Sequence, residues 1–418
     1  MAASWLLMSV EGPAHSAVSA RLPNPEINLA AWGGIVFPLC LIIEAPIIML
    51  LAASTARSRD WSSYRQLRRF THRTSALLTL LHALIAFTPL YDVVVRSIMG
   101  APEAIVEPAR RGLMIMLPWT WAIAYRRFNQ GILIRFGHSR AVGLGTFVRL
   151  TSNGIVLTLG FLRGTLSGVI VASSAVATGV VAEAIYAGLR ARPVIRDRLR
   201  TTRSQTAPRS FRAFLVFYVP LALTSLLNLL TPPLTSAALS RMPEALPSLA
   251  LWPVLTGLVF ILRSGGIAYN EVVVALMDQP QAVRTLRRFA LLLALLTTAA
   301  LLLLAATPLS AFWFTTLSAL PERLTRLAQK ALWLALLLPL IAVLQSWYQG
   351  ILVHSERTRG ITEAVGLYLL VVVALLGAGV IWGEVAGIFV GMAAMGIAGV
   401  IQTAWLWYRS RRVLREFQ

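Results

Sequence analysis

Apolar stretches of about twenty residues or more recur along the whole chain, and short polar connections separate them. An α-helix rises about 1.5 Å per residue, so a helix of this length crosses a hydrocarbon core of roughly 30 Å. No polar stretch is left over that could form a soluble domain. The pattern predicts twelve membrane-spanning helices, at residues 1–20, 27–54, 72–97, 111–135, 141–162, 166–189, 213–240, 247–277, 288–312, 327–353, 360–382 and 385–408.

Basic residues gather in alternate connections between these helices. The richest are residues 57–73, 190–212 and 409–415, whereas the intervening connections carry fewer arginines. Cytoplasmic connections of membrane proteins have an excess of Lys and Arg. The pattern therefore places both termini in the cytoplasm, which requires an even number of spans, and indicates a multi-pass protein of a bacterial cytoplasmic (inner) membrane.

Composition agrees with a membrane protein and excludes other classes. Of the 418 residues 57% are hydrophobic and 13% are charged, with a mean hydropathy of +0.71, values that soluble domains rarely combine. The net charge of +21 comes from arginines between the apolar stretches, so membrane lipids and not nucleic acid are the expected partners. Cys40 is the single cysteine and lies inside an apolar stretch, which excludes a disulfide framework and a thiolate metal cluster.

The residue types needed for catalysis are scattered. The sequence has no phosphate-cradling glycine loop, no paired aspartate motif and no second His or Cys at metal spacing from His82. We therefore expect neither an enzyme nor an ATPase, and neither a metal nor a cofactor. We interpret His82 as a packing or hydrogen-bonding residue. Transport driven by an ion gradient, or by the solute's own gradient, is the remaining function class.

The chain contains an internal repeat. Three short sequences recur in the same order: SAVSARLP and SAALSRMP at residues 16–23 and 236–243, LRRF at 67–70 and 286–289, and QGIL at 130–133 and 349–352. The first pair is 220 residues apart and the other two are 219 apart. Three collinear matches indicate a duplication. Each half has six predicted spans, an even number, so the two repeats are parallel.

The repeat predicts how the chain is divided. We expect a first six-helix lobe at residues 1–190, a basic cytoplasmic linker at 191–212 and a second six-helix lobe at 213–418. In this register the counterparts of residues 211–220 lie at or before residue 1. The first helix is therefore expected to lack its opening turns.

A parallel duplication of six spans joined by a long basic linker resembles the MATE transporters and the wider MOP superfamily of exporters and flippases. Within that superfamily HALIAF at residues 82–87, ARRG at 109–112 and QGILIR at 130–135 resemble the progressive ankylosis (ANK) branch. The resemblance implies two lobes forming a V, a central cavity and a rocking motion that opens it alternately to each side. It also implies efflux of organic anions, as in the ANK branch, or export coupled to proton or sodium entry through carboxylates, as in the multidrug members.

Ionisable residues inside the predicted spans are candidates for function, because a charge at mid-bilayer costs about 2.5–3.5 kcal/mol on insertion scales. Through the offset of 219, Glu44 falls on Arg263, whereas an offset of 220 would place it on Ser264. Opposite charges at equivalent positions could form a latch across the cleft or contact the solute. Pairing of each charge within its own lobe is the alternative.

Glu11 lies in the sequence VEGP of the first span, two residues before Pro13. The resembling multidrug transporters place a carboxylate that binds the coupling cation in this helix, and a proline kink would free carbonyl groups beside it. Glu11 and Glu44 are therefore the predicted ion-coupling residues. The alternative for Glu11 is a hydrogen bond to a neighbouring helix.

The remaining candidates suit an anionic solute, because Arg binds carboxylates and phosphates through two parallel hydrogen bonds. Asn153 follows Arg149 by one turn on the same face of its helix. The two could line a basic pocket of the first lobe together with Arg126, Arg127 and Asn129 of the preceding span. Pairing with lipid phosphate is the alternative for Arg126 and Arg127. Glu183 is interpreted as a proton site or as a residue that tethers helices. The predicted solute or cavity residues are Arg126, Asn129, Arg149, Asn153, Arg263 and Glu271, with Arg127 beside them.

The sequence thus predicts an all-α polytopic membrane protein with a V-shaped MATE-like fold. Its predicted function is secondary active export of a small organic anion by alternating access, coupled to a proton or sodium gradient. Cationic multidrug efflux by antiport and flipping of a lipid-linked substrate are the alternatives. Its partners are membrane lipids and the small solute, and we expect a monomer.

Overall fold

The computed structural model describes residues 2–202, 211–279 and 281–416, and within these ranges it is all helical, with no β-strand. The helices of the first half are α1 (Ala2–Ser19), α2 (Pro25–Leu29), π-helix η1 (Ala30–Val36), α3 (Phe37–Glu44), 3₁₀-helix η2 (Ala45–Ile47), α4 (Leu50–Arg57), α5 (Trp61–Phe87), α6 (Leu90–Asp92), π-helix η3 (Val93–Ile98), α7 (Glu103–Ile115), α8 (Leu117–Arg135), α9 (Ser139–Arg163), α10 (Gly168–Val194) and π-helix η4 (Ile195–Leu199). Those of the second half are α11 (Phe211–Leu239), α12 (Ala245–Leu276), α13 (Ala282–Ala306), α14 (Leu309–Ala311), π-helix η5 (Phe312–Leu317), α15 (Glu322–Leu334), α16 (Leu338–His354), α17 (Arg359–Trp382) and α18 (Gly387–Glu416).

Within the described ranges, eight helices are long and apolar enough to cross a membrane, and ten are if two bent pairs each count as one span. One bent pair is α5 with the segment 90–98, at 88°, and the other is α15 with α16, at 40°. The all-helical membrane class is confirmed, while the count of twelve spans stays a prediction. Some predicted boundaries differ: α5 begins at Trp61 and not at residue 72, because its first turns are basic but still helical.

The internal repeat reappears in the positions of the helices. The π-helices η3 and η5 begin 219 residues apart, at Val93 and Phe312. Gly164 and Gly383, also 219 apart, end α9 and α17 in the left-handed conformation, with φ of 66° and 68°. The similarity of the two halves therefore extends well beyond the three matching sequences.

A π-helix explains why the offset changes from 220 to 219. Asn24 and Glu244, 220 residues apart, both have positive φ before the second helix of their half, whereas α4 and α12 end 219 apart at Arg57 and Leu276. Between these points the first half contains η1, while α12 is continuous. A π-turn accommodates one extra residue in a helix. Because η1 precedes α3, the offset at Glu44 is 219.

Close helix packing recurs at equivalent glycines. A Cβ atom at Gly160 of α9 would overlap Val171 of α10, and one at Gly379 of α17 would overlap Val390 of α18. Both pairs are related by the offset of 219. The absence of a side chain therefore lets each helix approach the next one closely, in both halves.

The helices form two compact units, which we call the first-half unit (Leu22–Asn24 and Ala31–Pro233) and the second-half unit (Met1–Arg21, Pro25–Ala30 and Leu234–Gln418). This grouping differs from the expected division at residues 190 and 213, because the first helix of each half packs with the other half.

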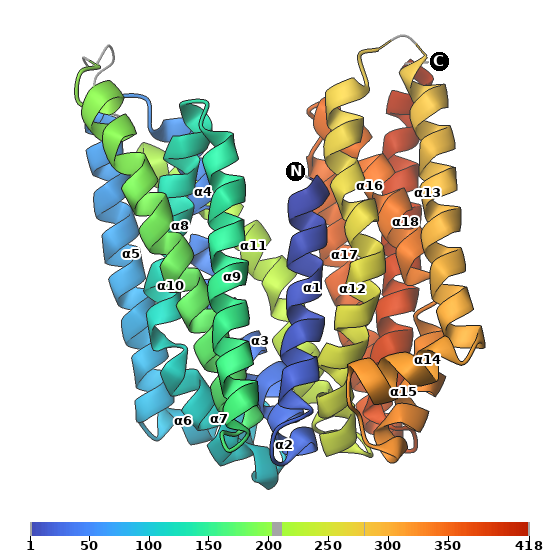
Figure 1. The fold of residues 1–418 in the computed structure, drawn as a ribbon. Helices are drawn as coiled ribbons and strands as arrows, with labels where there is room; N and C mark the ends of the chain where they lie inside the picture. The colour runs from blue at the N-terminus through green and yellow to red at the C-terminus, as the bar shows by residue number, and fades with distance from the viewer. Residues whose placement is uncertain (1, 203–210, 280, 417–418) are drawn as a thin grey trace. The chain divides into compact units, whose positions relative to one another are not determined.

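In the second-half unit α1 lies alongside α12 (Figure 1). In the first-half unit the opening part of α11 packs on α5, where the rings of Phe214 and Tyr218 each lie 4.8 Å from the ring of Phe70. Each unit therefore contains most helices of its own half and a helix segment from the other half.

Candidate functional site

A buried carboxylate joins three helices of the first-half unit. Glu183 of α10 has a side chain that is 1% exposed. Arg126 of α8 donates a hydrogen bond to its Oε2 atom, and Gln130 of the same helix donates one to Oε1 at 2.9 Å. Arg149 of α9 is an ion-pair partner, with its Nε atom 3.8 Å from Oε2. The contacts support the interpretation of Glu183 as a helix tether.

Glu44 adds a second buried acid to this group. It ends α3, where Pro46 in the following 3₁₀-turn interrupts the helix. The residue is 3% exposed, and it interacts electrostatically with Arg127 and Arg126. Within the described residues its Oε2 atom accepts no hydrogen bond. We call Glu44, Arg126, Arg127, Arg149 and Glu183 the ionic cluster.

The second half has different residues at all five equivalent positions, and four of the five are uncharged. Through the offset of 219 the ionic cluster corresponds, in the order just given, to Arg263, Gln345, Ser346, Tyr368 and Gln402. One contact is retained in changed form. Gln345 donates a hydrogen bond to Gln402 at 2.8 Å, where Arg126 donates to Glu183. Tyr368 interacts electrostatically with Arg263.

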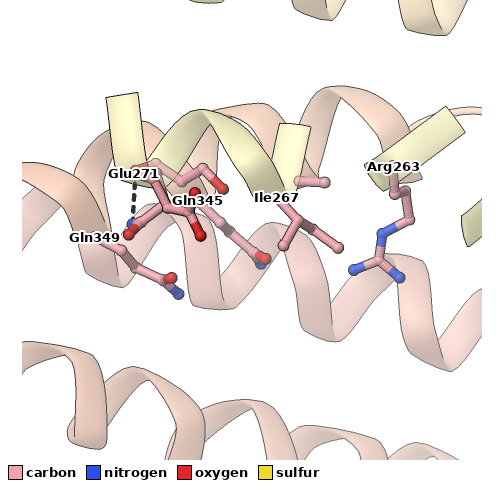
Figure 2. A pocket seen from close by; sticks show the side chains of 8 residues that line it. Arg263, Ile267, Glu271, Gln345 and Gln349 are labelled. Atoms are coloured by element: carbon pink, nitrogen blue, oxygen red, sulfur yellow. Dashed lines mark hydrogen bonds between the residues drawn. The ribbon is translucent and has the colours of Figure 1, made fainter. Parts of the chain in front are cut away.

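Where the first half has the ionic cluster, the second half has a cavity of about 270 Å³. It lies between α12 and α16 and is lined by Arg263, Ile267, Asn270, Glu271, Ala342, Gln345, Ser346 and Gln349. Figure 2 shows Arg263 at one end of the lining and Glu271, Gln345 and Gln349 toward the other. The Nε atom of Arg263 is buried and has no hydrogen-bond acceptor within the described ranges.

The lining suits a small polar molecule that carries a negative charge. A guanidinium group offers five N–H donors in a planar fork that matches carboxylate and phosphate. The side-chain amides of Gln345 and Gln349 supply both donors and acceptors, and Glu271 supplies a carboxylate. Arg263 and Glu271 are eight residues apart on α12, which is about 12 Å along a helix. The cavity therefore has a cationic end and an amide-rich end that also accepts hydrogen bonds.

The structure distributes the predicted solute residues over three places. Arg263 and Glu271 lie together in the cavity, whereas Arg126 and Arg149 belong to the ionic cluster. Asn129 instead lines a separate pocket of the first-half unit, and its Nδ2 atom donates to the carbonyl oxygen of Tyr125 at 2.8 Å. Asn153, the remaining predicted solute residue, is on α9 with Arg149 and is buried, 2% exposed.

Glu11 lies in α1, within the second-half unit. Its backbone carbonyl lies 2.7 Å from Nδ1 of His15, which is buried. The neighbouring Gly12 lies close to Gly257 of α12. Ion coupling at Glu11 and a latch between Glu44 and Arg263 both stay predictions.

His82 is fully buried, and both of its ring nitrogens are engaged. Nε2 lies 2.9 Å from the carbonyl oxygen of Leu113, so it is the protonated nitrogen, and Nδ1 lies 2.8 Å from the hydroxyl of Thr120. The ring thereby links α5 to α7 and α8 across the break between those two helices. This is the hydrogen-bonding role expected for it.

The amide residues Gln130, Gln345, Gln349 and Gln402 were not among the candidates from the sequence. A signal for them exists in the repeat itself. Applying the offset of 219 to Arg126 and Glu183 gives Gln345 and Gln402, two polar residues inside apolar spans. A charged pair in one half and an amide pair at the equivalent positions of the other indicate that the two positions are in contact in both halves.

The fold is that of the MATE transporters of the MOP superfamily. No family model and no curated protein matches the sequence. An inward-facing multidrug resistance MATE family transporter superposes with a TM-score of 0.65 at 17% identity, over 99% of this chain and 96% of that chain. The lipid II flippase MurJ superposes with a TM-score of 0.74 at 16% identity, over 96% and 85%.

A third similar structure is a MOP superfamily transporter from Pyrococcus furiosus, described as having a binding pocket of reverse polarity. Its TM-score is 0.59 at 18% identity, over 99% of this chain and 95% of that chain. Likenesses at such identities establish the fold. The ANK branch is not among these structures, and that part of the resemblance stays a prediction.

Proposed function

We propose that this chain is a secondary transporter that exports a small organic anion by alternating access and binds it in the cavity at Arg263. One observation carries the proposal. Arg263 presents a guanidinium group to a cavity of about 270 Å³, and its buried Nε atom has no hydrogen-bond acceptor within the described residues.

A buried donor without an acceptor costs about 1–3 kcal/mol, and more when it is charged. An anionic ligand that accepts hydrogen bonds from Arg263 would remove this cost. In the first half the arginines of the ionic cluster have Glu183 as an internal partner, and the corresponding residue of the second half, Gln402, is neutral. The guanidinium group of Arg263 is therefore proposed to have the anionic solute as its binding partner.

The size and polarity of the cavity favour a small solute. At about 270 Å³ the cavity lies just below the roughly 300–1,000 Å³ of pockets for drug-sized ligands, which favours an organic acid or phosphorylated compound of a few carbon atoms. The distal amides of Gln345 and Gln349 would accept and donate hydrogen bonds to hydroxyl or amino groups of that solute. A cationic drug would meet repulsion from Arg263.

Coupling to a proton or sodium gradient is proposed to occur at Glu44. Its carboxylate is buried, and Oε2 accepts no hydrogen bond within the described ranges. Binding of a cation there would change the balance of charge against Arg126 and Arg127, and so the energy of the ionic cluster. A charge change at a packed cluster can bias one of two conformations over the other. Glu11 is the second candidate.

Flipping of a lipid-linked substrate is the second candidate function, because the flippase MurJ gives a TM-score of 0.74. Its headgroup would need to fit beside the cavity at Arg263. The volume of about 270 Å³ favours the small solute.

Transport by proteoliposomes tests the proposal. Small organic anions, cationic dyes and fluorescent lipids are offered to the wild type, to Arg263→Gln and to Arg326→Gln. Arg326 is an exposed arginine that pairs with Glu322, so it controls for the loss of one positive charge. We expect anion transport to fall at least about tenfold in Arg263→Gln and to remain in Arg326→Gln, since the loss of a hydrogen-bonded charge contact costs about 2–5 kcal/mol. Cationic dye transport that survives Arg263→Gln unchanged, without anion transport by the wild type, contradicts the proposal.

A further inference from the structure

The first-half unit contains a second pocket, of about 560 Å³, which the proposed transport does not use. Residues from the first turns of α5, from α8 and from the end of α10 line it, including Tyr64, Arg68, Tyr125 and Arg192. Arg200, which directly follows η4, is also part of the lining. No residue of the ionic cluster lines this pocket, so it is a separate place in the molecule.

The charge of this pocket is strongly positive. Four arginines line it, and none of its lining residues is acidic. Arg196 forms an ion pair with Asp197 at 2.7 Å. Within the described part of the chain, Arg68, Arg192 and Arg200 form no ion pair with a carboxylate, and Arg200 instead lies over the ring of Trp61, 5.2 Å from its centroid. Three cationic groups are therefore available to a ligand.

The arginines alone do not identify a ligand site, because basic residues mark this end of the spans in both halves. Arg68 and Arg192 correspond to Arg287 and Arg411 through the offset of 219, and such residues determine membrane orientation. The evidence for a site lies in what surrounds them.

The polar floor of the pocket is particular to the first half. Tyr64, Tyr125 and Asn129 line it, whereas the equivalent residues of the second half are Val283, Leu344 and Tyr348. Gly188 is also part of the lining, and a Cβ atom there would overlap the ring and hydroxyl of Tyr125. The second half has Trp407 at this position. A residue without a side chain thus keeps a tyrosine hydroxyl at the floor of a cationic pocket.

The lining also extends from a charged end to an apolar region. Tyr64, Arg68 and His72 follow each other at intervals of four residues on α5, so they lie along one face over about 12 Å. The ring of His72 lies 5.7 Å from that of Trp121. Trp121 is itself 38% exposed. A ligand that fills this space would have its charge at Arg68 and apolar parts toward His72.

We propose that this pocket binds the phosphodiester headgroup of an anionic membrane lipid. Arginine and tyrosine hydroxyl groups are suitable donors to phosphate oxygens, and basic pockets between membrane helices bind such headgroups. The stacked rings of Trp61 and Tyr64, 5.2 Å apart, are of the kind enriched at the membrane interface. The volume is larger than one phosphate ion requires. This inference does not depend on the proposed transport function.

The purified chain in a neutral detergent tests the site. Native mass spectrometry and thermal unfolding are measured with phosphatidylglycerol, with phosphatidylcholine of the same acyl chains, and with inorganic phosphate. We expect retention of phosphatidylglycerol and a rise in Tm with that lipid alone. An equal rise in Tm with inorganic phosphate would identify a site for free anions. Equal retention of phosphatidylcholine would identify unspecific binding of lipid around the protein. Either result overturns the proposal.

The repeat supplies a matched control for the variants. The double variant Arg68→Gln with Arg192→Gln should lose most of the retained phosphatidylglycerol and most of the rise in Tm. The double variant Arg287→Gln with Arg411→Gln, at the equivalent positions, should keep both. Arg68 and Arg192 are exposed, so folding should persist, and Tm without lipid checks this. Equal losses in the two double variants would mean that general attraction by basic residues causes the binding, which contradicts a specific site. Arg192→Gln alone gives a second, milder variant that should weaken binding.

Discussion

Gln345 donates a hydrogen bond of 2.8 Å to Gln402 at the two positions where the first half has the buried pair of Arg126 and Glu183. The equivalent helices of the two halves are thus joined at the same positions, by charged groups in one half and by amides in the other. The change has a consequence for Arg263, whose half of the molecule lacks an acid equivalent to Glu183. The two halves share packing but differ in electrostatics at these positions.

The equivalence predicts how the ionic cluster contributes to stability. Glu183→Gln leaves buried arginines without their carboxylate, and breaking a buried pair in this way costs about 3–5 kcal/mol. Arg126→Gln with Glu183→Gln recreates the amide pair of the second half, so we expect it to regain a large part of that loss. Thermal and denaturant unfolding in detergent measure both variants. A double variant that is less stable than Glu183→Gln would show that the amide pair does not fit the first half.

The proposed coupling site predicts a separation of transport modes. Glu44→Gln cannot release a proton or hold a sodium ion through its side-chain charge, so uptake driven by an ion gradient should be lost. Exchange of labelled for unlabelled solute needs no gradient and should persist, while Glu44→Asp, which keeps the acid, should retain part of the gradient-driven rate. Gradient-driven transport at the wild-type rate in Glu44→Gln would assign coupling elsewhere, with Glu11 as the next residue to substitute.

Much of this organisation could be predicted from the sequence, and particular residues show where the prediction stops. The offset of 219 related Glu44 to Arg263, but the choice against Ser264 required η1, because a π-turn has no clear sequence signal. Bends such as the one after Phe87 interrupt apolar stretches that look continuous. Arg263 and Glu271 were both predicted as cavity residues, but their spacing turns Glu271 by roughly 80° around the helix from Arg263, so the cavity they share was seen only in the structure. Glu183 and Arg126 lie on different helices, and their contact depends on helix rotations that apolar periodicity does not determine.

Asp60, outside the spans, gives a prediction for pH dependence. It precedes α5, and its Oδ1 atom accepts hydrogen bonds from the backbone amides of Ser62 at 2.9 Å and Ser63 at 3.0 Å. Burial opposes ionisation of this carboxyl group, but the hydrogen bonds from Ser62 and Ser63 outweigh it and lower its pKa. The stabilisation is therefore present above the unfolded pKa of about 4 and is lost as the pH falls through the lower folded value.

Asp60→Ala should consequently reduce the free energy of unfolding by about 0.5–2 kcal/mol at neutral pH. The difference from wild type should shrink as the pH falls below about 4. Asp60→Asn, which can still accept from a backbone amide, should retain part of the effect. Unfolding measured from pH 7 to pH 3 checks this, and a difference that does not change with pH would show that the carboxylate charge is not involved.

The glycine contacts predict a position-specific effect on α9. Gly160→Ala places a Cβ atom against Val171, where the neighbouring side chain of α10 leaves no room, and overpacking of this kind typically costs about 1–3 kcal/mol. Gly154→Ala on the same helix places its Cβ atom in open space, and alanine favours helix over glycine by up to about 1 kcal/mol. The two variants make the same chemical change in different surroundings. We therefore expect Gly160→Ala to lower Tm and Gly154→Ala to raise it. Since Gly379 repeats the contact with Val390, Gly379→Ala should resemble Gly160→Ala, and a neutral effect at both sites would mean that these helix pairs separate at little cost.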